Sequence, residues 1–335
     1  MRKGIAAVLI CLAGIGAASA APVPVVPAKP DVIDLAPVLV SGVQPGPGLW
    51  KVTAPNGNAL WILGTVSPLP AKLEWRADEV QAVIASAQEV LGPPGWTVEP
   101  DIGFFKGLTL LPAAMKAARD PHGRTLREVL PPDLYARWAV LKRRYLGRDA
   151  GVEKDRPLVA SARLYGEALE EVGLSGRSLV TKVIEKAAKA RGLKPVPTRV
   201  GLRIDNPRQA LKEVRATALD DVTCFQRTLD VVEHQLPVLA ARANAWSQGD
   251  VEALSRLSVQ SQYVACVDAV VGSTFGKRRG LADLDIQARQ KWLVAARGSL
   301  QRNAVTFASV PVSALVIPGG YLDLLREAGY AVESP

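Results

Sequence analysis

The sequence predicts an α/β (α+β-like) fold, with a mixed central sheet built from N- and C-terminal strands and a large helical middle region. Runs rich in Val, Leu, Ile and Trp occur at residues 49–65 and again at residues 310–332. The chain between them repeats apolar residues at helical spacing. Hydrophobic residues make up 48% of the chain and charged residues 22%, which is ordinary for a globular protein with a sizeable core.

The first twenty residues are typical of a secretory signal peptide. A basic start precedes a short apolar run at residues 5–13 and a small-residue site, Ala-Ser-Ala, so we expect cleavage between Ala20 and Ala21. The apolar run is shorter than the roughly 20 residues that a membrane-spanning helix needs. No later run reaches that length. We therefore expect a periplasmic or secreted protein with no transmembrane segment after leader removal.

The composition after the leader predicts a linker and one domain. Residues 21–45 mix proline with valine and alanine and hold few charges, which favours an extended linker. We expect residues 46–335 to form a single domain with a helical insertion at about residues 105–300.

The segment from Leu49 to Thr65 predicts a β-hairpin. Two β-rich runs, at residues 50–54 and 59–63, flank a Pro-Asn-Gly-Asn turn. An Asn-Gly pair between such runs is a strong hairpin signal. The second run is apolar at every position, which indicates a strand buried on both faces.

Helical periodicity predicts the elements that follow the hairpin. We expect a new helix to start at Pro131-Pro132, and we expect the helical pattern to split near Gly173 to Gly176 and to break near Pro237. The expected helices cover residues 77–91, 125–145, 158–191, 207–257 and 286–305.

Four shorter elements complete the prediction. We expect a short strand at residues 194–200, a buried strand at 310–316 and a helix at 320–328 that Gly329 caps, followed by a last strand at 330–332. Strand–helix–strand order at each end of the domain implies a mixed sheet assembled from distant segments.

Two cysteines remain after leader removal, Cys224 and Cys266. In an oxidising compartment an even pair indicates a disulfide, which stabilises the fold by about 4 kcal/mol in the chain-entropy model. The alternative is two buried free thiols. A metal site on this pair alone would lack ligands, because zinc takes about four.

The charge of the chain argues against nucleic acid as a partner. Leader removal changes the net charge from +9 to +7, with 39 basic against 32 acidic residues. The basic residues are spread along the predicted helices, and no aromatic-rich RNA motif is present. A weak attraction to anionic envelope surfaces or acidic polysaccharide is compatible with this charge.

Three segments of the chain carry a family resemblance. The hairpin ends in Gly64-Thr65, residues 245–250 read Ala-Trp-Ser-Gln-Gly-Asp, and residues 318–332 form a Gly-rich turn, a leucine-rich helix and Gly-Tyr-Ala-Val. Together they resemble the TraB/GumN family of exported proteins, related to the Tiki metalloproteases and the erythromycin-esterase/ChaN-like group. The resemblance covers about residues 46–333 and identifies a divergent member.

The resemblance implies a site at the strand ends. The resemblance implies a His in Gly-Thr-x-His, a Glu in the next strand and a His before Leu at the last strand, proposed as metal ligands or acid–base groups, and such donors can bind a divalent metal and activate water. In this chain Ser67 occupies the position of the first His, Gly92 or Pro93 that of the Glu, and Ala314 that of the last His. We therefore expect no catalytic residue, no metal ligand and no cofactor at these positions.

Few other residues could replace the missing His and Glu of the family site. His122 lies in a turn and His234 on a helix beside Glu233, and neither belongs to the terminal strands. Glu89 could slide into the Glu position, but one carboxylate is not a metal site, and Glu99 lies beyond a Pro-Pro break. As a nucleophile, Ser67 would need a base such as Lys72 or a distant carboxylate. Ser313 is the remaining polar residue beside Ala314.

These observations favour a pseudoenzyme. We expect a non-catalytic binding or accessory protein of the cell envelope, whose partner is an unidentified envelope protein or polysaccharide. One alternative is an active metal-dependent, protease-like hydrolase that uses unrecognised residues. Another is a purely structural envelope protein with no ligand pocket.

Overall fold

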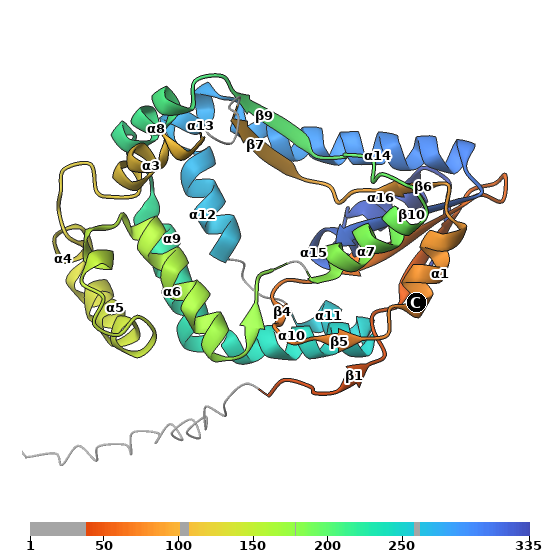
Figure 1. The fold of residues 1–335 in the computed structure, drawn as a ribbon, viewed down its shortest axis with the longest axis horizontal. Helices are drawn as coiled ribbons and strands as arrows, with labels where there is room; N and C mark the ends of the chain where they lie inside the picture. The colour runs from red at the N-terminus through yellow and green to blue at the C-terminus, as the bar shows by residue number, and fades with distance from the viewer. Residues whose placement is uncertain (1–37, 101–106, 178, 258–261) are drawn as a thin grey trace, which may run out of the picture. The chain divides into compact units, whose positions relative to one another are not determined.

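Among the described residues, five strands form the central sheet in the order β11-β2-β3-β10-β6 (Figure 1). The computed structural model describes residues 38–100, 107–177, 179–257 and 262–335, and the expected leader lies outside this range. The strands are β2 Leu49–Thr53, β3 Ala59–Thr65, β6 Glu89–Leu91, β10 Val305–Pro311 and β11 Ala331–Glu333.

The sheet joins the two ends of the domain. β2 and β3 form the antiparallel hairpin around the Asn-Gly turn, and β11 pairs antiparallel with the outer side of β2. β10 runs parallel to both β3 and β6, with Val305 opposite Ala59 and Pro311 opposite Thr65. The predicted mixed sheet of N- and C-terminal strands is therefore confirmed.

The two central strands are buried because their sequences are apolar on both faces. Leu60, Ile62 and Leu63 of β3 and Phe307 and Val310 of β10 have no solvent exposure. Four helices pack around these strands or against each other. They are α1 Asp78–Ser86, α7 Leu179–Ala190, α14 Leu284–Arg302 and α16 Tyr321–Glu327.

A layer of packed helices forms the middle region, as predicted. α6 and α9 lie side by side, with α5 and α12 packed against α9 (Figure 1). Trp138 of α5 is fully buried and contacts Phe225 of α9 at a ring separation of 5.3 Å. The helices are α4 Leu126–Val129, α5 Pro132–Tyr145, α6 Pro157–Glu171, α9 Asp221–His234, α10 Leu236–Gln248, α11 Val251–Arg256 and α12 Gln262–Val271.

Short strands and helices connect these parts. Near the start of the described chain, Val43 and Gln44 form β1, which pairs with β5, and the Val40 amide donates to Asn244 Oδ1 at 3.0 Å. A parallel ribbon of β7 and β9 extends beyond β6. The remaining elements are β4 Leu69–Pro70, β5 Glu74–Trp75, β7 Trp96–Pro100, β8 Leu174–Ser175, β9 Val200–Ile204, α3 Leu111–Ala117, α8 Pro207–Ala216, α13 Thr274–Arg278, α15 Val312–Leu315 and the 3₁₀ turns η1 Gly151–Lys154 and η2 Leu281–Asp283.

Several predicted boundaries are wrong, and the stretch expected at residues 207–257 divides into α8, α9, α10 and α11. The helix expected at residues 77–91 ends at Ser86, and its last apolar residues form β6. The strand expected at 194–200 lies at β9, with an isolated bridge from Val196 to Leu91 before it. The strand expected at 310–316 ends at Pro311 and continues as α15. Short apolar runs have the same composition in a buried strand and a buried helix, so periodicity could not separate them.

None of the helices in the described part of the chain combines the length and the apolar character that crossing a membrane requires.

Candidate functional site

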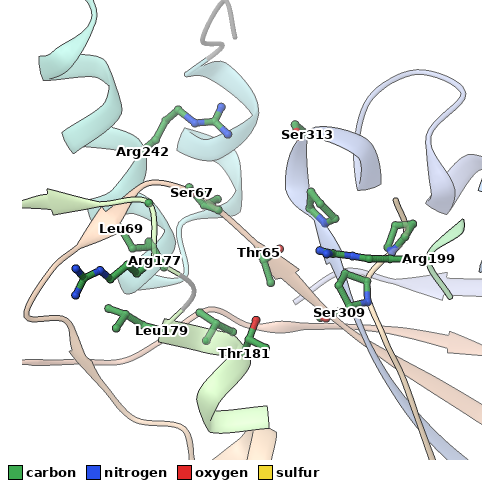
Figure 2. A pocket seen from close by; sticks show the side chains of 16 residues that line it. Thr65, Ser67, Leu69, Arg177, Leu179, Thr181, Arg199, Arg242, Ser309 and Ser313 are labelled. Carbon is green, nitrogen blue, oxygen red and sulfur yellow. The ribbon is translucent and has the colours of Figure 1, made fainter. Parts of the chain in front are cut away.

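A cleft of about 300 Å³ opens where the parallel strands end (Figure 2). Parallel strands β3, β10 and β6 present their carboxyl ends at one edge of the sheet, and the segments that follow them form part of the wall. The rest of the wall comes from the β8–α7 loop, the start of α7, the segment before β9 and α10. The polar residues that line this cleft are Thr65, Ser67, Arg177, Thr181, Arg199, Arg242, Ser309 and Ser313.

The structure brings the three predicted site segments together at this cleft. Ser67 is exposed and lines it. Gly92 is not part of the lining, but Pro93 and Pro94, which follow it, form part of the wall. Ala314 lies in α15, where it packs against the main core, while its neighbour Ser313 lines the cleft.

Gly92 is held by the strand beside it. Its amide donates to the Val196 carbonyl at 2.9 Å, and its carbonyl accepts from the Thr198 hydroxyl at 2.8 Å. A Cβ atom at Gly92 would lie 3.1 Å from the Val196 carbonyl oxygen. A larger side chain here would push the neighbouring segment away, so the glycine serves close backbone packing.

The family-like segments contact one another behind the cleft. The Trp246 indole donates to the Gly64 carbonyl at 2.7 Å, and a Cβ at Gly64 would lie 2.8 Å from Val312 of α15. Gly249 ends α10 in the left-handed conformation, with φ 75°, and the Asp250 side chain caps α11. The mid-chain motif therefore forms the tight turn between α10 and α11 and places Trp246 in contact with the end of the hairpin.

The charge of the cleft is positive. Arg177, Arg199 and Arg242 line it, and the described lining contains no carboxylate, imidazole or thiol. Figure 2 shows the three arginines on different sides of the cleft, with the guanidinium of Arg199 directed toward its middle. Arg177 is exposed and points away from the middle in this view.

Arg242 is the most constrained of the three arginines. It is half-buried on α10, and its Nη1 donates to the Leu257 carbonyl at 2.5 Å. Burial lowers the pKa of its guanidinium below the usual range.

The other candidate groups from the sequence lie elsewhere. His122 is exposed in a turn, and His234 is exposed beside Glu233 at 3.6 Å. Glu89 accepts from Asn303 at 2.7 Å at the start of β6, the end opposite the cleft, and Glu99 accepts from the Thr97 hydroxyl on β7.

Lys72 is exposed and does not line the cleft, so it is not placed as a base for Ser67. Arginine is protonated at any physiological pH and cannot take that role.

The donor set of the cleft does not fit a divalent metal. Metals of this kind need imidazole, thiolate or carboxylate donors, whereas a guanidinium offers only N–H groups and positive charge. Within the described residues, no three His, Cys, Asp or Glu side chains gather closely enough to hold an ion. The residues present therefore do not match the metal centre that the resemblance implies.

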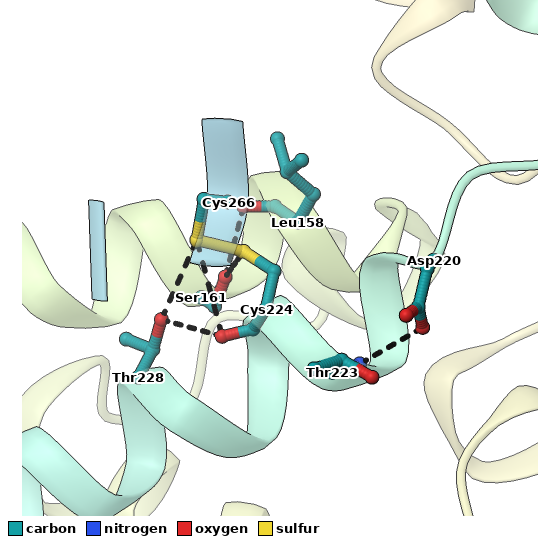
Figure 3. The surroundings of a disulfide bond; sticks show 7 residues. All are labelled: Leu158, Ser161, Asp220, Thr223, Cys224, Thr228 and Cys266. Atoms are coloured by element: carbon teal, nitrogen blue, oxygen red, sulfur yellow. Dashed lines mark hydrogen bonds between the residues drawn. A yellow bond between two sulfur atoms is a disulfide. The ribbon is translucent and has the colours of Figure 1, made fainter. Parts of the chain in front are cut away.

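The predicted disulfide is present. Cys224 of α9 and Cys266 of α12 are joined, with their Cα atoms 4.6 Å apart (Figure 3). The Thr228 hydroxyl donates to the Cys224 carbonyl at 2.9 Å beside it. The bond fixes two helices of the middle region and belongs to no site.

Sequence reasoning missed the arginines and Ser309 because they form no local motif. Arg177, Arg199 and Arg242 come from three separate elements. One signal was available: Arg242 is the only charged residue of α10, whose other residues are mostly apolar and buried. A lone cation in an apolar helix indicates a special environment.

The fold and the cleft define a class of mixed α/β protein with a ligand-sized cleft at the carboxyl edge of its parallel strands. The model of the TraB/PrgY/gumN family matches residues 48–334, nearly the whole chain. The chain therefore belongs to the TraB/PrgY/gumN family. No curated protein and no solved structure matches it.

Proposed function

We propose that this chain is an exported, non-catalytic binding or accessory protein of the cell envelope that keeps the family fold without the His/Glu metal site. The observation that carries the proposal is the lining of the cleft, where hydroxyls and arginines stand at the edge that the resemblance assigns to metal ligands.

Hydrolysis needs a group that activates water or a nucleophile. Ser67 and Ser313 are the exposed hydroxyls at the strand ends. A serine hydroxyl is a weak nucleophile unless a base lies within hydrogen-bond reach, and the described lining contains arginine but no carboxylate or imidazole that could act as that base. Binding without turnover is the activity that this set of groups supports.

Export is supported by two features. The Cys224–Cys266 disulfide suits an oxidising compartment. Residues 1–20 have the sequence of a leader that would be removed between Ala20 and Ala21.

Elemental analysis of the purified protein tests the non-catalytic assignment. We expect zinc, manganese and cobalt well below one equivalent, and no peptide or ester hydrolysis above blank after each metal is added. Stoichiometric metal that is lost in Ser67→Ala or Ser313→Ala would contradict the proposal. Ser255→Ala is the matched control, because Ser255 is exposed on α11 and its hydroxyl donates to the Glu252 carbonyl.

A further inference from the structure

The arginines of the cleft form no ion pair with a described carboxylate, which is ordinary for the exposed Arg177 and Arg199 but matters for the half-buried Arg242. Among the described residues, no ion pair joins a carboxylate to Arg177, Arg199 or Arg242. Arg199 and Arg242 therefore place two positive charges at one cavity of about 300 Å³ with no carboxylate of the described residues beside them, whereas Arg177 points away from its middle.

Among these arginines, Arg242 is the one whose partial burial costs free energy. Its guanidinium is partly removed from water, and its described hydrogen bond reaches a neutral carbonyl, that of Leu257. A cation that loses solvent without gaining an opposite charge is destabilising. The segment that follows Leu257, residues 258–261, reads Ser-Val-Gln-Ser and contains no acidic residue. An anion bound in the cleft would supply the missing charge.

Ser309 is a second, independent indication. The residue is 7% exposed on β10 and lines the cleft, yet its hydroxyl has no hydrogen-bond partner among the described residues. The hydroxyl oxygen is not among the fully buried, unpartnered polar atoms of the described residues, so it opens to the cleft, where it is available to a ligand atom. A hydroxyl donates well to a negatively charged oxygen.

The backbone at the wall of the cleft adds partial positive charge. The first turn of α7, at Leu179, Val180 and Thr181, forms part of the wall, and the amino end of a helix carries partial positive charge. The Lys291 ammonium donates to the Arg199 carbonyl at 2.6 Å, which fixes the segment that carries Arg199 and adds another cation nearby.

We propose that the cleft binds the oxyanionic group of a small ligand, a carboxylate, phosphate or sulfate, through Arg199, Arg242 and the Ser309 hydroxyl. The inference rests on the proposed binding function and names the chemical class of the ligand. Planar guanidinium groups match the paired oxygens of these anions. The volume is at the small end of ligand pockets, which suits a compact molecule such as a tricarboxylate.

Isothermal titration with citrate, phosphate and sulfate, each against chloride at equal ionic strength, tests this proposal. We expect saturable one-to-one binding of at least one of the three. Arg242→Gln and Arg199→Gln should each weaken it by at least about tenfold, because each removes a charge-assisted hydrogen bond. Arg242→Lys, which keeps the charge, should weaken it less than Arg242→Gln. The anion that saturates identifies the group.

Arg148→Gln is the matched control. Arg148 is exposed after α5 and does not line the cleft, so the variant loses the same net charge without touching the site. Absence of saturable binding by all three anions would overturn the proposal, as would equal weakening in Arg148→Gln and Arg199→Gln. Arg199 is exposed, so its variant is expected to fold and keeps the test decisive.

The two proposals can fail separately. Loss of anion binding would leave the absence of metal and hydrolysis untouched, and the ligand class alone would be wrong. Stoichiometric metal with turnover would overturn the non-catalytic assignment whatever the anion titrations give.

Discussion

Two arginines of the helical middle region, Arg156 and Arg242, show how differently the interior between the helices and the wall of the cleft treat charge. Between the packed helices, Arg156 is 6% exposed, and its guanidinium donates to Asp221 at 3.1 Å and to the Val214 and Thr217 carbonyls. At the cleft, the half-buried Arg242 donates to one neutral carbonyl. The charge of Arg156 is satisfied within the protein, which stabilises the fold. The cleft leaves charge unsatisfied, which marks it as a place for a ligand.

The sharpest test of this contrast is a matched pair of substitutions. Arg156→Met should destabilise the protein by about 3–5 kcal/mol, because it leaves Asp221 buried and unpaired. Arg242→Met should change stability by less than about 1 kcal/mol, because it removes a cation that has no carboxylate partner in the described structure. Urea unfolding at pH 7 measures both. Equal losses in the two variants would remove the distinction between the regions.

The disulfide of the middle region should have the next largest effect. Replacing Cys224 and Cys266 with alanine should lower the free energy of unfolding by about 2–4 kcal/mol, since the unfolded chain gains freedom. Anion binding at the cleft should be retained under native conditions, because the bond joins α9 and α12 and not the cleft wall. The oxidised bond itself is seen as a mass increase of about two hydrogens on reduction. An unchanged free energy of unfolding would contradict the structural role.

The smallest expected effect concerns Asp120. Burial raises the pKa of this carboxyl, but hydrogen bonds from Arg124 and from the His122 amide outweigh it, so the pKa lies below its ordinary value. A depressed pKa gives stability that is present above the unfolded value of 3.8 and is lost as pH falls through the folded value.

Asp120→Asn should therefore reduce stability at pH 7 and flatten its decline below pH 4. Urea unfolding at pH 7 and pH 3 measures the change. The cleft contributes no such acid dependence, because its described lining holds no carboxylate. If the free energy of unfolding of Asp120→Asn fell between pH 7 and pH 3 as steeply as that of the unsubstituted protein, protonation of Asp120 would not be linked to folding.

Much of the fold follows from local sequence. The Asn-Gly turn predicted the hairpin of β2 and β3, and the split near Gly173 separated α6 from α7. Each signal acts within a few residues, where backbone preference decides. The end of β10 was missed because Pro311 is the last residue opposite β3, and that register depends on pairing with a distant strand.

The residues of the site also fall into those that local sequence placed and those that it did not. Ser67 follows the end of β3 by two residues and lines the cleft, where the hairpin motif positions it. Ala314 was assigned to a strand and lies in α15 instead, behind the cleft wall that Ser313 lines. Arg177, Arg199 and Arg242 were not predicted, since no local pattern connects them.

The sequence by itself determined the mixed α/β class, the family and the identity of the cysteine pair, because these depend on motifs and composition that local segments carry. Only the tertiary structure decided which side chains share the cleft. Parallel pairing of β10 with β3 and β6 brings together strand ends more than 200 residues apart, and α10 then adds Arg242. Contacts at such separation arise from packing of the whole sheet, so the positive cleft is a property of the fold and of no single segment.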